Sequence, residues 1–376
     1  MAACRRCVIR VESATSISHF AFHITLNNDS MKTTAAILVA TDRPLELIDL
    51  EIPALRAGQV LIEVSHSGVC HTQLLEARGH RGEDKYLPHC LGHEGSGTVL
   101  EVGPDVSKCQ PGDRVILSWM KGLGADVPGT VYGSAAGNVN AGGLTTFQRH
   151  SVVSENRLTS LPVEISFRKA ALLGCAVPTG IGAVWNTAQV QQGQSVAVFG
   201  TGGIGLCAIA AAAIAGADPL IAVDINASRL KIACQLGATA TINATDSDPV
   251  EQIQASVAGG LDVAIEASGS PEVMQQALLS VRSRGGTVVV IGNARHGQRL
   301  EIDPTQLNQG KRLLGTWGGD NEPDRDFPRY CELMVTGKLN LSPLLAKIYT
   351  LETINDALDD LQAGRVPRPL VAMHAE

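Results

Sequence analysis

The sequence has no dense run of lysine and arginine: 30 basic residues face 37 acidic ones, and the net charge is −7. This balance argues against nucleic acid or an anionic membrane surface as the main partner. Long apolar runs are also missing, because the longest, residues 206–216, is rich in alanine and well short of the ~20 residues that span a bilayer. We therefore expect a soluble protein that acts on a small molecule.

No secretory signal is recognisable, although the chain holds nine cysteines. Their wide spacing in such a chain argues against a disulfide framework and for a reducing compartment, which we take to be the cytoplasm. Cys4 and Cys7 form a C-x-x-C pair, but no second pair of ligands and no strand–helix–strand pattern lies near them. Chance spacing is the better explanation of this pair.

The chain is long enough for about two domains, at the usual ~100–200 residues each, and its 44% of hydrophobic residues can form a core. Residues 1–30 have no sustained periodicity, whereas a strand pattern begins directly after Met31. We predict that residues 1–30 are a disordered extension, or that Met31 is the true start. A targeting peptide, suggested by three arginines and several serines, is the alternative.

A strand, a glycine-rich turn, a helix and a second strand follow one another between residues 194 and 224. In this order the glycines permit a tight turn and let the backbone approach a pyrophosphate at the helix N-terminus. The acid at the end of the second strand, Asp224, is placed to bind a ribose diol and to repel a 2′-phosphate, which favours NAD over NADP. The alternatives are an ordinary loop and, for Asp224, a helix N-cap. The expected contacts in the turn are Gly200, Gly202, Gly203, Ile204 and Gly205.

Strand patterns continue at residues 239–242, 262–266 and 287–292, with helical stretches at 227–236 and 271–281 between them. This alternation predicts an α/β domain with a doubly wound parallel sheet. Gly292, where the last of these strands ends, is a further candidate cofactor contact. Arg229 is another, although a solvated helix charge explains it nearly as well.

Residues 60–120 differ, since short alternating strands and frequent glycine turns predict a β-rich domain. Cys70 and His93 lie in this region, and Cys175 stands just before the dinucleotide fold. Two thiolates and one imidazole suit zinc, and three protein ligands leave a fourth position open, as in a catalytic site. Buried inert cysteines and a satisfied core histidine are the ordinary alternatives.

Several motifs in one order carry a resemblance to a known family: Gly68-Val69-Cys70-His71-Thr72, Gly92-His93-Glu94-Gly95-Ser96-Gly97, Pro111-Gly112-Asp113-Arg114-Val115, Leu173-Gly174-Cys175, Pro178-Thr179-Gly180, and Gly200 to Gly205 with Asp224. From about Met31 to the C-terminus the chain resembles the zinc-containing alcohol dehydrogenases of the medium-chain dehydrogenase/reductase superfamily. The resemblance implies a GroES-like β-rich catalytic domain over residues 31–176, a Rossmann NAD-binding domain over 177–317, and a return to the catalytic domain over 318–376.

The resemblance also implies roles for single residues. Thr72 belongs to the proton relay of the alcohol, Glu94 stands beside the zinc, and Thr179 lies at the nicotinamide end. His71 and Arg368 are placed near the pyrophosphate, with a surface arginine as the alternative for Arg368. Trp119 falls where an aromatic wall of the substrate pocket is usual, with a core position as its alternative, and the small run 141–143 predicts an apolar pocket of moderate width.

The pattern departs from many relatives in three places. Residues 116–133 contain no cysteine, so the four-cysteine structural zinc site cannot form and one catalytic zinc per subunit is expected. Gln73 replaces an acid that holds the other ring nitrogen of the zinc-bound histidine; its carbonyl oxygen is predicted to accept that N–H. Leu75 stands where some relatives use a histidine to pass the proton to solvent, which leaves water, ribose, His71 or His80 for this step.

The sequence thus predicts a zinc-dependent alcohol dehydrogenase that transfers hydride between an alcohol and NAD, with the aldehyde or ketone formed in reverse. A zinc-free quinone or enoyl reductase on the same fold, or a non-catalytic dinucleotide-binding protein, is the alternative. Primary alcohols and aldehydes, aromatic ones included, head the substrate list, ahead of secondary alcohols and thiol adducts. Self-association into a homodimer or homotetramer is expected through the sheet edge near residues 287–293 and 298–302.

Overall fold

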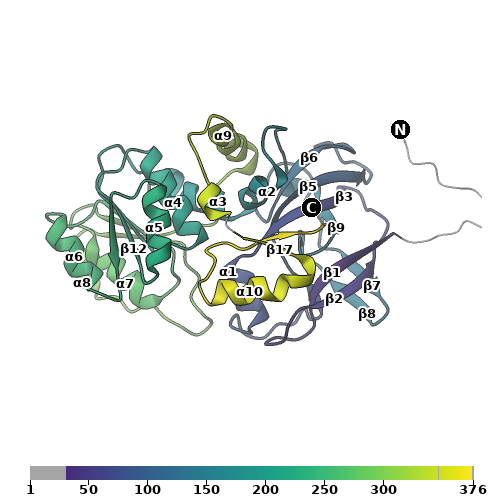
Figure 1. The fold of residues 1–376 in the computed structure, drawn as a ribbon, viewed down its shortest axis with the longest axis horizontal. Helices are drawn as coiled ribbons and strands as arrows, with labels where there is room; N and C mark the ends of the chain where they lie inside the picture. Colours follow the sequence, from purple (N-terminus) through teal and green to yellow (C-terminus); the bar gives the residue numbers. More distant parts are fainter. Residues whose placement is uncertain (1–30, 346, 375–376) are drawn as a thin grey trace, which may run out of the picture.

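The computed structural model describes residues 31–345 and 347–374. They form two lobes side by side, one built around strands β1 to β10 with β17 and β18, and the other around strands β11 to β16 (Figure 1). The predicted extension 1–30, with Cys4 and Cys7, lies outside the described residues.

The first lobe contains a closed barrel and a seven-stranded sheet. The barrel consists of β1 (Lys32–Leu38), β2 (Glu46–Glu51), β7 (Val131–Ser134), β8 (Gly137–Asn140) and β4 (His89–Cys90). The sheet runs in the order β10 (Leu158–Ser160), β6 (Arg114–Ser118), β5 (Glu94–Val102), β3 (Gln59–Gly68), β18 (Leu370–Ala372) and β17 (Ile348–Thr350), with β9 (His150–Ser154) also paired to β3. The pairing of β18 with β3 returns the C-terminal segment to this lobe.

The second lobe is a six-stranded parallel sheet in the order β13 (Ala240–Asn243), β12 (Leu220–Asp224), β11 (Val196–Phe199), β14 (Val263–Glu266), β15 (Thr287–Val290) and β16 (Arg312–Gly315). The direction of growth reverses at β11, and in such sheets ligands bind at the carboxyl ends of the strands beside this switch point. The predicted strands at 239–242, 262–266 and 287–292 are therefore confirmed, with small changes at their ends.

Short helices connect the strands of the first lobe, and longer ones cover the second. The α-helices are α1 (His71–Ala77), α2 (Phe167–Ala170), α3 (Ala176–Gly182), α4 (Gly203–Ile214), α5 (Ala227–Gln235), α6 (Pro249–Ser256), α7 (Pro271–Ser280), α8 (Pro304–Asn308), α9 (Pro323–Val335) and α10 (Ile354–Gln362). Single turns lie at η1 (Glu155–Arg157), η2 (Ala171–Gly174), η3 (Ala183–Thr187), η4 (Ser342–Leu344) and η5 (Leu351–Thr353). The helices predicted at 227–236 and 271–281 correspond to α5 and α7.

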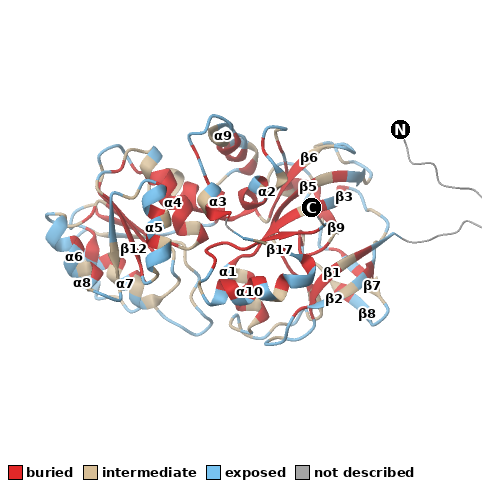
Figure 2. Cartoon of the chain, viewed as in Figure 1, coloured by how far each residue is buried: buried red, intermediate tan, exposed pale blue. Residues whose placement is uncertain are grey.

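One apolar cluster crosses from lobe to lobe, because it includes Ile116 of β6, Val177 of α3 and Leu206 of α4, all fully buried. Figure 2 shows this buried band continuing between the two lobes through α3 and α4. Helix α4 is apolar on nearly every side, so it is buried between α3 and the sheet. The lobes therefore share a core, which holds the first lobe against the second.

The prediction about the sheet edge is wrong in its position. Residues 287–290 form an inner strand, since β15 pairs with β14 on one side and with β16 on the other. The edge beyond β15 is β16, a four-residue strand whose sequence Arg-Leu-Leu-Gly is too short to give a clear alternation. Residues 298–302 form no helix or strand.

No single helix among the described residues is both long and apolar enough to cross a membrane. One bent pair, Phe167–Gly174 followed by Ala176–Thr187, meets the criteria of length and composition only when its two parts are taken together.

Candidate metal centre and dinucleotide cleft

The three predicted metal ligands come together although 105 positions separate the first from the last in sequence (70 to 175). Cys70 ends the loop after β3 and begins α1, His93 directly precedes β5, and Cys175 lies between η2 and α3. Their ligand atoms all lie within 4.8 Å of one another, and both cysteines are buried. Nε2 of His93 lies 3.2 Å from Sγ of Cys175.

Gly174 allows Cys175 to come close to the other two ligands. A Cβ on Gly174 would lie 2.1 Å from the Leu117 carbonyl oxygen and 2.8 Å from the Cα of Glu94, distances that no side chain tolerates. Only glycine therefore lets the segment before Cys175 lie directly against strands β5 and β6. The motif Leu173-Gly174-Cys175 is a packing requirement as well as a ligand position.

The donor set fits a zinc ion. Hydrogen bonding from the Cys175 thiol lowers the pKa of Cys70 well below its usual range, although burial opposes this effect. Two cysteine sulfurs and one imidazole in this geometry offer two soft sulfur ligands and one nitrogen ligand, which is the preference of Zn²⁺. Three protein ligands leave one coordination position for a small molecule.

Glu94 and Arg368 form a buried ion pair beside these ligands. Nε of Arg368 donates to Oε1 of Glu94 at 2.8 Å, and Oε2 of Glu94 accepts the Ala176 N–H at 3.1 Å. Burial raises the pKa of Glu94 in spite of the nearby guanidinium. Arg368 is 3% exposed, so the alternative of a surface arginine is wrong. Arg368 reaches the glycine turn, since its Cδ is 3.0 Å from where a Cβ of Gly203 would stand.

The glycine turn has the geometry that the sequence predicts. Gly200 has φ of 87°, and a Cβ on Gly205 would lie 1.9 Å from the Gly200 carbonyl oxygen. Helix α4 therefore packs against the turn only because Gly205 lacks a side chain. A Cβ on Gly202 would meet nothing within 4 Å, so this part of the backbone faces open space.

Asp224 ends β12 and is 8% exposed. Its Oδ2 accepts the Thr201 N–H at 2.6 Å and the Thr201 hydroxyl at 2.8 Å, and its Oδ1 accepts the Asn226 N–H at 2.8 Å. The N-cap of α5 is Asn226, so the N-cap alternative for Asp224 is wrong. Asp224 instead ties the glycine turn to the start of α5.

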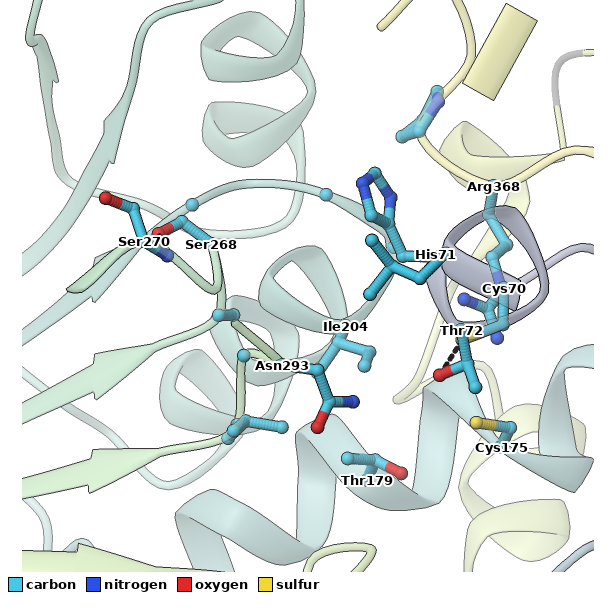
Figure 3. A pocket seen from close by; sticks show the side chains of 18 of the residues that line it. Cys70, His71, Thr72, Cys175, Thr179, Ile204, Ser268, Ser270, Asn293 and Arg368 are labelled. Atoms are coloured by element: carbon cyan, nitrogen blue, oxygen red, sulfur yellow. Dashed lines mark hydrogen bonds between the residues drawn. The ribbon is translucent and has the colours of Figure 1, made fainter. Parts of the chain in front are cut away.

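A cavity of about 620 Å³ joins the metal ligands to the glycine turn. Figure 3 shows Cys70, Thr72 and Cys175 at one end and Ser268 and Ser270 at the other, with Thr179, Ile204 and Asn293 between them. The predicted residues that line it are Cys70, His71, Thr72, His93, Trp119, Cys175, Thr179, Gly200, Gly202, Gly203, Ile204, Asp224, Arg229, Gly292 and Arg368. Glu94 and Gly205 lie behind this surface.

Three residues of the lining have a buried polar atom without a hydrogen-bond partner among the described residues: Trp119 at Nε1, Thr179 at its hydroxyl and Arg229 at Nε. Nη2 of Arg368 makes no hydrogen bond either, although it pairs with the Glu94 carboxylate. Buried polar groups are normally hydrogen-bonded, so these atoms are suited to a polar ligand.

Aromatic rings border the metal end of the cavity. The ring of Trp119 lies 6.5 Å from that of His93 and 5.1 Å from that of Trp317, measured between centroids. Trp119 is half-buried and also packs against the shared core, so it is a wall of the cavity and a core neighbour together. The small residues Ala141 and Gly142 do not reach this cavity; they line a neighbouring one of about 520 Å³, which shares Arg81 and His93 with the first.

The structure places Leu75 and the two histidines that were considered for passing the proton to solvent. Leu75 is buried and lines the cavity. His71 lines it too, and burial lowers the pKa of its ring. The backbone carbonyl of His80 accepts the His296 N–H at 3.0 Å, but its side chain does not line the cavity.

The prediction for Gln73 is wrong in the orientation of the amide. The carbonyl Oε1 accepts the Cys70 N–H at 3.0 Å, and the amide nitrogen Nε2 is the atom that faces Nδ1 of His93. The reason lies in the start of α1, where the Cys70 N–H needs an acceptor and Gln73, three residues on, supplies it.

Sequence reasoning missed several residues of the cavity. They follow the carboxyl ends of β14, β15 and β16, where loops of an open parallel sheet carry ligand contacts. The predicted strand ends near 266 and 292 were a sufficient signal for the first two loops, whereas β16 gave none. The missed residues on these three loops include Ser268, Ser270, Asn293, Thr316 and Trp317.

The fold and this site define a zinc-binding dehydrogenase. Residues 56–163 match the alcohol dehydrogenase GroES-like domain, and residues 203–336 match the zinc-binding dehydrogenase family. The chain is 35% identical, over 91% of its length and 100% of the relative, to an S-(hydroxymethyl)glutathione dehydrogenase of Synechocystis sp.. It belongs to the zinc-containing alcohol dehydrogenases of the medium-chain dehydrogenase/reductase superfamily, with a GroES-like and a Rossmann domain, and is an oxidoreductase acting on CH–OH groups with a nicotinamide dinucleotide.

Solved structures agree with this assignment. An alcohol dehydrogenase zinc-binding domain protein from Burkholderia ambifaria is 34% identical with a TM-score of 0.85, and the alignment covers 92% of this chain and 100% of that one. A benzyl alcohol dehydrogenase from Acinetobacter calcoaceticus is 31% identical with a TM-score of 0.83, at the same coverage.

Proposed function

We propose that this dehydrogenase oxidises primary alcohols, aromatic ones included, to aldehydes with NAD and catalyses the reverse reduction. The carrying observation is the cavity that joins the cluster of Cys70, His93 and Cys175 to the glycine turn. Trp119 and Trp317 beside the cluster favour an aromatic or otherwise apolar substituent on the alcohol. The similarity to a benzyl alcohol dehydrogenase agrees with this choice.

Cys70, His93 and Cys175 would hold one zinc ion, which when bound would act as a Lewis acid that lowers the pKa of the alcohol hydroxyl. The absence of cysteine from residues 116–133 supports a single zinc per subunit. Thr72 lines the cavity beside Cys70 (Figure 3). Its hydroxyl lies 3.7 Å from the Cys70 sulfur. We assign to this hydroxyl the transfer of the substrate's proton, which the neighbouring Leu75 cannot carry.

The glycine turn, His71, Thr179, Arg229, Gly292 and Arg368 would bind the dinucleotide, which when bound would accept the hydride. Asp224 supports a preference for NAD over NADP, because its carboxylate lies beside the turn, where it would repel a 2′-phosphate. The domain boundaries that we propose are residues 31–176, 177–317 and 318–376. A homodimer or homotetramer is proposed for the assembly.

Metal analysis combined with an alcohol panel tests this function. We expect the wild-type chain to bind one zinc and to reduce NAD in the presence of benzyl alcohol, followed by the absorbance of NADH. Cys70→Ala and His93→Ala should lose both zinc and turnover, whereas Cys234→Ala, an exposed free cysteine on α5, should keep both. A fully active variant without zinc would contradict the assignment and favour a zinc-free reductase, and NAD binding without turnover on any alcohol would favour a non-catalytic protein.

A further inference from the structure

The side chain of Gln73 connects two of the metal ligands. It is 2% exposed, its Oε1 accepts the Cys70 N–H at 3.0 Å, and its Nε2 faces Nδ1 of His93. A carboxamide has one accepting oxygen and one donating nitrogen, so in this orientation Nδ1 of His93 must be the acceptor. The proton of the imidazole then resides on Nε2, which lies 3.2 Å from the Cys175 sulfur.

This arrangement conflicts with metal binding at Nε2. A neutral imidazole that binds a metal through Nε2 carries its proton on Nδ1, and this N–H needs an acceptor. Gln73 can supply one only by turning its amide, which places the NH₂ group against the Cys70 N–H. One buried donor is then left without an acceptor, because a single carboxamide cannot serve both N–H groups with separate oxygens.

We propose that Gln73 is a positioning residue that weakens the hold on zinc: its amide must turn when the ion binds at His93, at the expense of the hydrogen bond that fixes Cys70. A carboxylate at this position would serve both donors at once, with one oxygen on the Cys70 N–H and the other on the His93 N–H. Gln73→Glu therefore strengthens the site. This inference rests on the zinc site of the proposed function.

Zinc release to an excess of a chromogenic chelator tests the inference without any measurement of turnover. Partners of metal-bound histidine change metal affinity by about 10- to 100-fold, so we expect zinc to leave Gln73→Glu at least about tenfold more slowly than the wild type. Gln73→Leu, which removes both hydrogen bonds, should release zinc at least as fast as the wild type. Gln275→Glu on the exposed side of α7 adds the same charge far from the metal and should match the wild type.

Release from Gln73→Glu at the wild-type rate, or faster, would overturn the role of Gln73 while leaving the zinc site intact. A wild-type chain that takes up no zinc would overturn the site itself. A crystal structure of the zinc-loaded wild type gives a second test that needs no variant: we expect Oε1 of Gln73 on Nδ1 of His93. Oε1 still on the Cys70 N–H, with His93 donating to another oxygen, would contradict the turn of the amide.

Discussion

The carboxylate of Asp224 holds three protein donors, so its charge is fixed in place before any dinucleotide binds. Asp224→Asn keeps one accepting oxygen and removes the charge. Hydrogen bonds to charged groups contribute about 1.5–3 kcal/mol, so we expect kcat/KM for NAD to fall about tenfold or more. The fall in kcat/KM for NADP should be smaller, because removal of the charge also relieves its repulsion of the 2′-phosphate. Steady-state kinetics with both dinucleotides measures the ratio, and an unchanged ratio would contradict the assigned role.

The hydroxyl of Thr72 is the other single group on which the proposed chemistry depends. Thr72→Ala removes the proton-transfer group, and general acid–base catalysis contributes about 10²- to 10⁴-fold, so we expect kcat to fall at least about 100-fold with zinc content unchanged. Thr72→Ser keeps the hydroxyl and should retain most of the rate. Turnover of Thr72→Ala at the wild-type rate would show that another group or water moves this proton.

At the scale of elements, carboxylates fasten the loops over residues 107–125, which run into the cysteine-free segment 116–133. Glu155, at the start of η1, is 2% exposed and accepts three backbone N–H groups from two loops: Ser107 at 3.0 Å, Lys108 at 3.1 Å and Ala125 at 2.8 Å. Asp324 of α9 accepts the Leu123 N–H at 2.6 Å and pairs with Lys108. These contacts hold residues 107–125 against η1 and α9.

Glu155→Gln tests this fastening. The amide places a donor against backbone donors, which costs about 1–3 kcal/mol, so we expect the free energy of unfolding at pH 7 to fall by about this amount. Burial raises the pKa of Glu155, but the three backbone hydrogen bonds outweigh it and the net pKa is lowered. The contribution of Glu155 is therefore present above the ordinary carboxyl pKa of 4.5 and is lost as the pH falls through the lowered value.

Urea unfolding across this pH range measures the effect. The difference between Glu155→Gln and the wild type should shrink in acid, whereas Glu101→Gln, at an exposed position of β5, should differ little at any pH. A destabilisation of Glu155→Gln that stays constant down to the lowest pH would assign it to packing instead of charge.

Whether the sequence predicted an element depends on how far apart along the chain its interacting residues lie. The strand, turn and helix at 195–214 and the acid at 224 are set by local spacing, so they were predictable, and so was the metal trio once family motifs fixed its order. The amide orientation of Gln73 and the burial of Arg368 depend on partners 20 and 274 positions away. Strand β16 forms by pairing with the free edge of β15, whereas the sequence Arg312–Gly315 does not favour a strand by itself.

At the scale of the whole molecule, chemistry depends on both lobes, since the metal ligands belong largely to one and the glycine turn to the other. The shared core fixes the lobes on one side of the cavity. On another side the His296 N–H of the second lobe donates to the His80 carbonyl of the first at 3.0 Å. The distance from alcohol to nicotinamide is therefore set by the fold as a whole, and small displacements of either lobe would slow hydride transfer.

The open edge of the parallel sheet leads to a prediction about assembly. Strand β16 has no partner on its outer side among the described strands, and Leu307, Leu314 and Trp317 near it are exposed, Trp317 by 81%. Unprotected edges with apolar side chains pair readily with another chain. Because Trp317 also lines the cavity, a second copy seated on this edge would cover the outer face of the substrate wall.

Leu314→Lys places a charge on this edge, and we expect it to shift the protein from an oligomer to a monomer in light scattering coupled to size exclusion. The monomer should have a raised KM for alcohol, because the second copy no longer covers Trp317. Its zinc content should stay unchanged. Leu279→Lys on α7 is a matched control, since both leucines are 37% exposed and only Leu314 lies on the edge. An oligomer that survives Leu314→Lys but dissociates with Leu279→Lys would move the interface from the sheet edge to the helical face.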